Sequence, residues 1–245
     1  MKKLLPLLCA LGCLAQPALA ANNINALQNL GQADFRSLSE DLGSALSYKA
    51  VTPTTSLGVT GFDLGLEITQ TKMAKSSQLW GTITGSGNAV SSLYIPKLHV
   101  AKGLPFGIDI AAFYSKIPTT NISLIGAELR YAVLDGGLVS PTIGIRGAYS
   151  KMSGVSQLAL DTKSLDISIS KGIAMLSPYI GVGQVWTNSN PNVVVGGVSL
   201  LNKESFSQNK VFGGVNLNLG LTNFCLEFDK TGAAQSTSFK LGFRW

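Results

Sequence analysis

The chain has 245 residues, of which 45% are hydrophobic and only 13% are charged, with a formal net charge of +6. Its lysines and arginines are scattered without a run or a basic stripe, so the positive charge does not indicate nucleic-acid binding. Beyond the first 20 residues there is no run of 18 apolar residues, which excludes a bundle of membrane-spanning helices.

The first 20 residues have the pattern of a cleavable signal peptide. Lys2 and Lys3 precede the apolar run Leu4–Leu14, and Ala18-Leu19-Ala20 supplies the small residues of a cleavage site. We predict export and cleavage after Ala20. A lipoprotein site at Cys13 is the alternative, but the usual leucine three positions earlier is missing. Cleavage leaves Cys225 as the only cysteine, so no intrachain disulfide can form.

Residues 21–57 form the first predicted unit of the mature chain, and their pattern is helical. Phe35, Leu38, Leu42 and Leu46 recur at helical spacing opposite a polar face. We expect a short amphipathic helix. Its first interpretation is a periplasmic leader packed beneath the following domain, and its second is a plug inside that domain.

Residues 58–245 form the second predicted unit, which contains ten segments of strand character. They are Val59–Thr69, Leu93–Ala101, Phe106–Lys116, Leu124–Val133, Thr142–Ser150, Thr162–Lys171, Pro178–Trp186, Lys210–Leu219, Asn223–Lys230 and Ser236–Trp245. Most are near the roughly 9–11 residues that a tilted membrane-spanning strand needs. Because Pro96 cannot donate a hydrogen bond, we expect a bulge or a frayed strand there.

The last strand carries the clearest evidence for a membrane. Phe239, Leu241, Phe243 and Trp245 share one face, which in a soluble edge strand would be an aggregation hazard. This ending resembles the C-terminal signal of bacterial outer-membrane β-barrels, which implies insertion by the barrel-assembly machinery with the help of periplasmic chaperones. We therefore predict an all-β fold: a closed antiparallel up-and-down transmembrane barrel, monomeric, exposed to outer-membrane lipid.

The connections between the predicted strands alternate in length. Those after the second, fourth, sixth and eighth strands are compact, whereas Gln70–Ser92 and Thr187–Gln208 are the two longest. Outer-membrane barrels have short periplasmic turns and longer external loops, and an even strand number satisfies this pattern. A twelve-strand alternative adds Ala45–Val51 and Val193–Leu201.

The predicted inward faces hold most of the charge. The expected lumen network consists of Asp63, Glu67, Lys97, His99, Asp109, Glu128, Arg130, Arg146, Asp166, Glu227, Asp229, Lys240 and Arg244. If the first and last strands pair, one register places Asp63 opposite Arg244 and Glu67 opposite Lys240. In the last hairpin, counting across Lys230–Gln235 places Glu227 opposite Lys240.

Five stretches resemble an uncharacterised family of proteobacterial barrel proteins, known only as a domain of unknown function. They are Phe35–Gly43, Gly61–Glu67, Lys102–Asp109, Gly126–Ala132 and Ser170–Gly172. The resemblance implies a fold and a compartment, the cell outer membrane, but assigns no activity.

The main functional interpretation is a non-catalytic structural protein or narrow channel with a mixed-charge lumen, without metal, cofactor or nucleic acid. The alternative is transport of hydrophobic small molecules, suggested by the apolar stretch Val193–Leu201. A further alternative is a lipid-modifying enzyme. His99 is the only histidine, and its local sequence supplies no orienting carboxylate.

Overall fold

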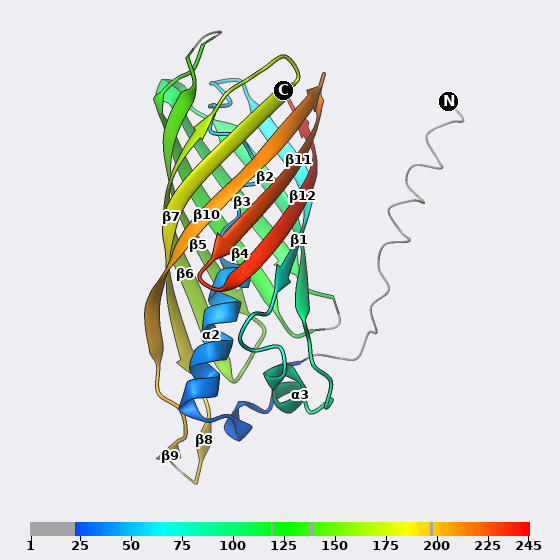
Figure 1. Ribbon diagram of the computed structural model, residues 1–245, viewed down its shortest axis with the longest axis vertical. Helices are drawn as coiled ribbons and strands as arrows, with labels where there is room; N and C mark the ends of the chain where they lie inside the picture. Colours follow the sequence, from blue (N-terminus) through cyan, green and yellow to red (C-terminus); the bar gives the residue numbers. More distant parts are fainter. Residues whose placement is uncertain (1–22, 119, 138–139, 197) are drawn as a thin grey trace, which may run out of the picture.

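The computed structural model describes residues 23–118, 120–137, 140–196 and 198–245. Within them, ten strands form a closed antiparallel barrel in the order β1-β12-β11-β10-β7-β6-β5-β4-β3-β2 (Figure 1). The barrel strands are β1 Phe62–Lys72, β2 Ser92–Gly103, β3 Ile108–Lys116, β4 Ser123–Leu134, β5 Thr142–Ser153, β6 Leu158–Ser170, β7 Leu176–Pro191, β10 Glu204–Leu219, β11 Thr222–Thr231 and β12 Ala234–Arg244. The predicted ten-stranded barrel is confirmed.

The twelve-strand alternative is wrong. Val194–Val195 (β8) and Val198–Ser199 (β9) pair only with each other in a separate two-stranded sheet. Residues 45–51 contribute no strand, because they begin as the end of a helix and continue as irregular chain. β7 and β10 instead extend to 16 residues each, well beyond the predicted ranges.

The strands bury their polar side and expose their apolar side, which is the reverse of a soluble barrel. In β1, Leu66 is 61% exposed, whereas Glu67 beside it is 5% exposed. Phe228 and Phe243 are 58% and 56% exposed on β11 and β12. Several tyrosines and tryptophans of the strands also face outward: Tyr94, Tyr114, Tyr131, Trp186 and Trp245. Water would be a poor solvent for this surface, and acyl chains would be a good one.

The closing register follows the sequence prediction. Strand β1 pairs with β12 so that Asp63 lies opposite Arg244 and Glu67 opposite Lys240. The predicted pairing within the last hairpin is wrong, since Cys225 lies opposite Lys240. The hairpin continues to Thr231 opposite Ala234, leaving a two-residue turn at Gly232 with φ of 59°. The shorter turn slides the register by two residues and keeps every side chain on its expected face.

The two ends of the barrel differ. At one end, which we call the turn end, the connections are short and one contains a 3-10 helix, η3 (Pro105–Gly107). The other end, the loop end, carries residues 73–91 with helix α3 (Leu79–Thr84) and residues 192–203 with β8 and β9 (Figure 1). Pro96 stays paired with Ile68 of β1, but the β2–β3 ladder stops at Leu98 opposite Tyr114, so β2 is frayed on its β3 side only.

The N-terminal segment lies inside the barrel. It contains a short 3-10 helix, η2 (Leu27–Asn29), and helix α2 (Gln32–Leu46), whose contacts are with β5, β6, β7, β10 and β12. The interpretation as a leader beneath the barrel is therefore wrong for the described part, residues 23–57. Gly43 allows the close approach, because a Cβ there would lie 2.4 Å from the Thr187 hydroxyl on β7. No helix in the described ranges is long and apolar enough to cross a bilayer.

We predict that Leu66→Arg destabilises the barrel by roughly 2–4 kcal/mol in lipid vesicles, because position 66 faces the acyl chains near the middle of β1. The measurement is urea unfolding followed by tryptophan fluorescence. Leu221→Arg is the matched control, since Leu221 is equally exposed in a turn-end connection. That change should cost no more than about 0.5 kcal/mol. Equal effects of the two changes would contradict a lipid-facing β1.

Candidate functional site

The loop-end half of the lumen is filled by apolar packing around α2. Phe35, Leu38 and Leu42 of the helix are fully buried. They belong to one cluster with inward side chains of the wall, among them Ile95, Phe113, Leu124, Met152, Leu158 and Leu160, and with Trp80 and Ile83 of α3. Such a cluster excludes water from this half of the barrel.

Beyond the helix, residues 47–57 run as irregular chain through the polar half of the lumen. Wall side chains hydrogen-bond to the backbone of five of these residues and to that of Leu46 at the end of the helix. The contacts are Ser150 Oγ to Leu46 O at 2.6 Å, Lys210 Nζ to Tyr48 O at 3.1 Å, Val51 N to Glu227 Oε2 at 2.8 Å, Arg130 Nη1 to Pro53 O at 2.8 Å, Thr54 N to Ser170 Oγ at 3.2 Å and Leu57 N to Asp109 Oδ1 at 3.0 Å. Residues 23–57, which we call the plug, thus fill the barrel from end to end.

Asp63 joins the two ends of the barrel sheet. Its carboxylate accepts hydrogen bonds from Lys240 Nζ at 3.0 Å and from Arg244 Nε at 2.8 Å. Arg244 also donates to Thr52 Oγ1 of the plug at 2.9 Å. The side chain of Lys240 is completely buried, and Asp63 is the carboxylate with which it forms an ion pair.

A second cluster crosses β4, β5, β6 and β10. Arg146 Nε lies 2.8 Å from Glu128 Oε2, and its Nη1 lies 3.6 Å from Asp166 Oδ2. Lys210 Nζ lies 2.9 Å from the same Asp166 oxygen. Separately, Arg130 binds Asp109 at 2.6 Å on the adjacent strands β3 and β4.

Two cations of the lumen, Lys210 and Lys49, are absent from the network predicted from the sequence. Lys210 lies on the inward face of β10, and strand alternation alone could have placed it there. Lys49 belongs to the plug and binds Asp229 Oδ1 at 2.5 Å, a contact without any local signal. With them, and leaving aside the rim residue Glu204, the inward faces of the described strands and residues 47–57 of the plug hold seven carboxylates and seven cations. The carboxylates are Asp63, Glu67, Asp109, Glu128, Asp166, Glu227 and Asp229, and the cations are Lys49, Lys97, Arg130, Arg146, Lys210, Lys240 and Arg244.

His99 is enclosed between the plug and the wall. Its Nε2 lies 3.0 Å from the Tyr48 hydroxyl, and its Nδ1 lies 3.7 Å from Glu67 Oε1. The fold therefore supplies the neighbouring carboxylate that the local sequence lacks. Lys97, two residues away, lies over the Phe113 ring, 5.1 Å from its centroid.

Cys225 and Glu227 meet a tyrosine on β7. The Tyr179 hydroxyl lies 3.2 Å from Cys225 Sγ and donates to Glu227 Oε2 at 2.7 Å. The three side chains are buried, which leaves this thiol no access to a substrate. Within the described ranges, no group of three or more His, Cys, Asp or Glu residues is placed to hold a metal ion.

At the loop end, ion pairs anchor α2 to the rim of the barrel. Arg36 binds Glu40 at 2.8 Å on the helix and Glu204 at 2.9 Å at the start of β10, and Glu40 also binds Lys75. Partial burial acts to raise the pKa of Glu40, but hydrogen bonds from Lys75 and Arg36 outweigh it and hold this pKa below its usual value. Glu40 is therefore ionised at neutral pH.

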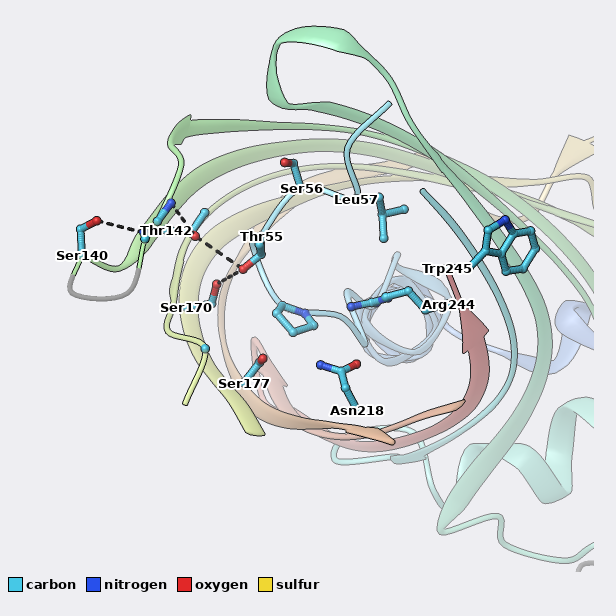
Figure 2. A pocket seen from close by; sticks show the side chains of 14 residues that line it. Thr55, Ser56, Leu57, Ser140, Thr142, Ser170, Ser177, Asn218, Arg244 and Trp245 are labelled. Carbon is cyan, nitrogen blue, oxygen red and sulfur yellow. Dashed lines mark hydrogen bonds between the residues drawn. The ribbon is translucent and has the colours of Figure 1, made fainter. Parts of the chain in front are cut away.

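At the turn end, the plug leaves the lumen through a shallow pocket of about 400 Å³. Figure 2 shows Thr55, Ser56 and Leu57 crossing the mouth, with Arg244 pointing into it. The Thr55 hydroxyl lies 3.5 Å from that of Thr142 and 3.4 Å from that of Ser170. These contacts are long and weak, so this end is held less tightly than the centre.

The four residues predicted to form a C-terminal insertion signal lie on the outer side of β12 and at its end: Phe239, Leu241, Phe243 and Trp245. Trp245 stacks on Phe62 with ring centroids 5.3 Å apart. Its backbone continues the β1–β12 ladder, since Phe62 N donates to Trp245 O at 2.8 Å. The chain end thus completes the closing seam.

We predict that Asp63→Asn destabilises the barrel by about 3–5 kcal/mol, because it leaves the buried Lys240 without its anionic partner. The measurement is urea unfolding of the folded protein in detergent. The double variant D63L/K240M removes both charges and should recover most of the loss. Additive losses in the double variant would contradict a mutually dependent pair.

No family model and no curated protein matches the sequence. Among solved structures, the N-terminal β-barrel domain of Pseudomonas aeruginosa OprF is 11% identical, with a TM-score of 0.38, over 75% of this chain and 97% of that one. Neisserial surface protein A is 11% identical, with a TM-score of 0.31, over 75% and 94%. The translocator domain of autotransporter NalP from Neisseria meningitidis is 9% identical, with a TM-score of 0.37, over 92% and 99%. These values establish neither a family nor a function for this chain.

Proposed function

We propose that this chain is a monomeric outer-membrane β-barrel protein without catalytic activity, whose lumen is closed at rest by the plug. It serves as a structural surface protein, or as a narrow channel that opens only when the plug moves. The observation that carries the proposal is the continuous occupation of the lumen by residues 23–57, packed in one half and hydrogen-bonded in the other.

The charged lumen supports a closed resting state. An ion path needs fixed charges that face water, whereas most of these charges face each other. Lys49 of the plug binds Asp229, and Arg244 donates to Thr52, so the plug is part of the charge network. Moving it would uncover buried polar groups, which resists spontaneous opening.

The compartment and the partners rest on separate observations. The apolar outer wall favours lipid over water, and the outward C-terminal residues fit recognition during insertion. The signal peptide with cleavage after Ala20 lies outside the described residues and stays a prediction, as do the barrel-assembly machinery and the periplasmic chaperones.

The two alternatives have less support. In the stretch that suggested hydrophobic transport, Val193 and Leu201 are buried in the lumen cluster, while Val194 and Val198 form the exposed β8–β9 sheet. Apolar side chains are thus used for packing at both ends of this stretch. For a lipid-modifying enzyme, His99 is 3% exposed and contacts Tyr48, which leaves it no path to a lipid.

We predict that the wild-type protein gives a closed baseline in planar lipid bilayers, and that deletion of residues 23–57 gives resolved single-channel steps. Folding of both proteins is checked by heat-modifiable migration on a gel. The variant S39C/S189C ties α2 to β7, where the two serine hydroxyls lie 2.8 Å apart. It should stay closed when oxidised. Open-channel conductance of the oxidised variant would show that ions pass with the plug in place, and would overturn the proposal.

We further predict that the long loops, and with them the described start of the plug, face the outside of the cell. Asn25→Cys at the loop end should react with a membrane-impermeant maleimide on intact cells, because Asn25 is exposed there. Lys203→Cys in the β7–β10 loop is the positive control, and Leu221→Cys at the turn end should react only after lysis. The wild-type background is low, since Cys225 is buried. Labelling of Leu221→Cys alone on intact cells would show that the turn end faces the outside, and would contradict the predicted orientation.

A further inference from the structure

The outer face of the barrel has an asymmetric distribution of charge. Five exposed lysines point outward from the loop-end halves of their strands: Lys72 on β1, Lys116 on β3, Lys151 on β5, Lys163 on β6 and Lys230 on β11. Among the acidic side chains of the described strands, only Asp161 points outward. This wall therefore presents positive charge to whatever surrounds the loop end.

Lys72 and Lys230 lie in one row across the sheet. Gln235 of β12 is the pairing partner of both, so the lysines flank it on the two neighbouring strands. Neither lysine forms an ion pair with any residue in the described ranges, unlike Lys49, Lys210 and Lys240 of the lumen. Two ammonium groups without an ion-pair partner, one on each side of β12, favour an anion with several oxygens that can reach both.

A groove of about 530 Å³ lies on the outer wall directly beside these two lysines. Val211 lies opposite Lys230, and Gly213 lies opposite Phe228 on the same pair of strands. Because Gly213 has no side chain, it leaves a depression bordered by Ile180, Val211 and Phe228. The groove is apolar toward the centre of the wall and cationic toward the loop end.

We propose that this groove binds one anionic lipid, with its phosphate on Lys72 and Lys230 and one acyl chain over Gly213. The inference rests on the proposed function, because only a membrane supplies lipid to this face. The occupant is a phospholipid-like molecule of the leaflet on the loop side. Both ends of the groove specify it: phosphate oxygens match paired lysines, and a hydrocarbon chain matches the apolar depression.

The test uses the full-length protein purified in detergent, first shown to be a folded barrel by heat-modifiable migration. Lipid adducts are then measured by native mass spectrometry with phosphatidylglycerol, with phosphatidylcholine and with inorganic phosphate. We expect phosphatidylglycerol to bind preferentially. K72Q/K230Q should weaken phosphatidylglycerol binding about thirtyfold, since lysines at the membrane surface contribute additively to the attraction.

Two further variants distinguish a specific lipid site from nonspecific attraction of anionic lipid to the surface lysines. G213L fills the groove and keeps both lysines, and a Cβ there meets its nearest atom, Tyr179 O, at 3.4 Å, so the barrel should still fold. G213L should weaken phosphatidylglycerol binding as much as K72Q/K230Q does. K151Q/K163Q removes the same charge from β5 and β6 and should leave binding unchanged.

Three results would overturn the lipid site: equal losses in K151Q/K163Q and K72Q/K230Q, no effect of G213L, or inorganic phosphate binding as tightly as the lipid. Failure of the wild type to migrate as a folded barrel would instead contradict the proposed function, so the two failures are distinguishable.

Discussion

The pairing of β1 with β12 is the interaction on which the rest of the structure depends. A sheet in a membrane cannot leave an open edge, because unpaired backbone groups find no partner in hydrocarbon. Asp63 strengthens this seam by binding both Lys240 and Arg244, and the stacked rings of Phe62 and Trp245 close its outer side. Closure then fixes which side chains face inward on all the remaining strands.

Once the barrel is closed, the polar and charged groups of its lumen need hydrogen-bond or ion-pair partners. The inward faces of the strands and residues 47–57 of the plug carry seven carboxylates and seven cations, and Lys49 of the plug is one of those cations. The plug is therefore both an occluding segment and a partner of the wall. Its apolar helix fills the loop-end half, and its irregular part uses wall side chains to satisfy backbone groups in the other half. The same division explains how a filled lumen and a charged inner wall occur together.

Much of the barrel was predictable from the sequence, because side-chain alternation along a strand is a local property. Alternation in Phe62–Lys72 identifies the inward Asp63 and Glu67 and the outward Leu64 and Leu66 without knowledge of any neighbour. Charge pairing then gave the closing register, since Asp63 with Arg244 and Glu67 with Lys240 share one alignment. The register of the last hairpin was predicted wrongly because it depends on turn length. The turn at Gly232 is shorter than its polar sequence indicates.

The sequence by itself thus determined the strand faces, the closed architecture and the apolar outer wall, because each follows from patterns within about ten residues. Only the tertiary structure decided where residues 23–57 lie. An amphipathic helix with Phe35, Leu38 and Leu42 on one face can bury that face equally well beneath a barrel or inside it. What places it inside is a set of partners more than 100 residues away, such as Ser189 for Ser39 and Asp229 for Lys49, which no local pattern contains.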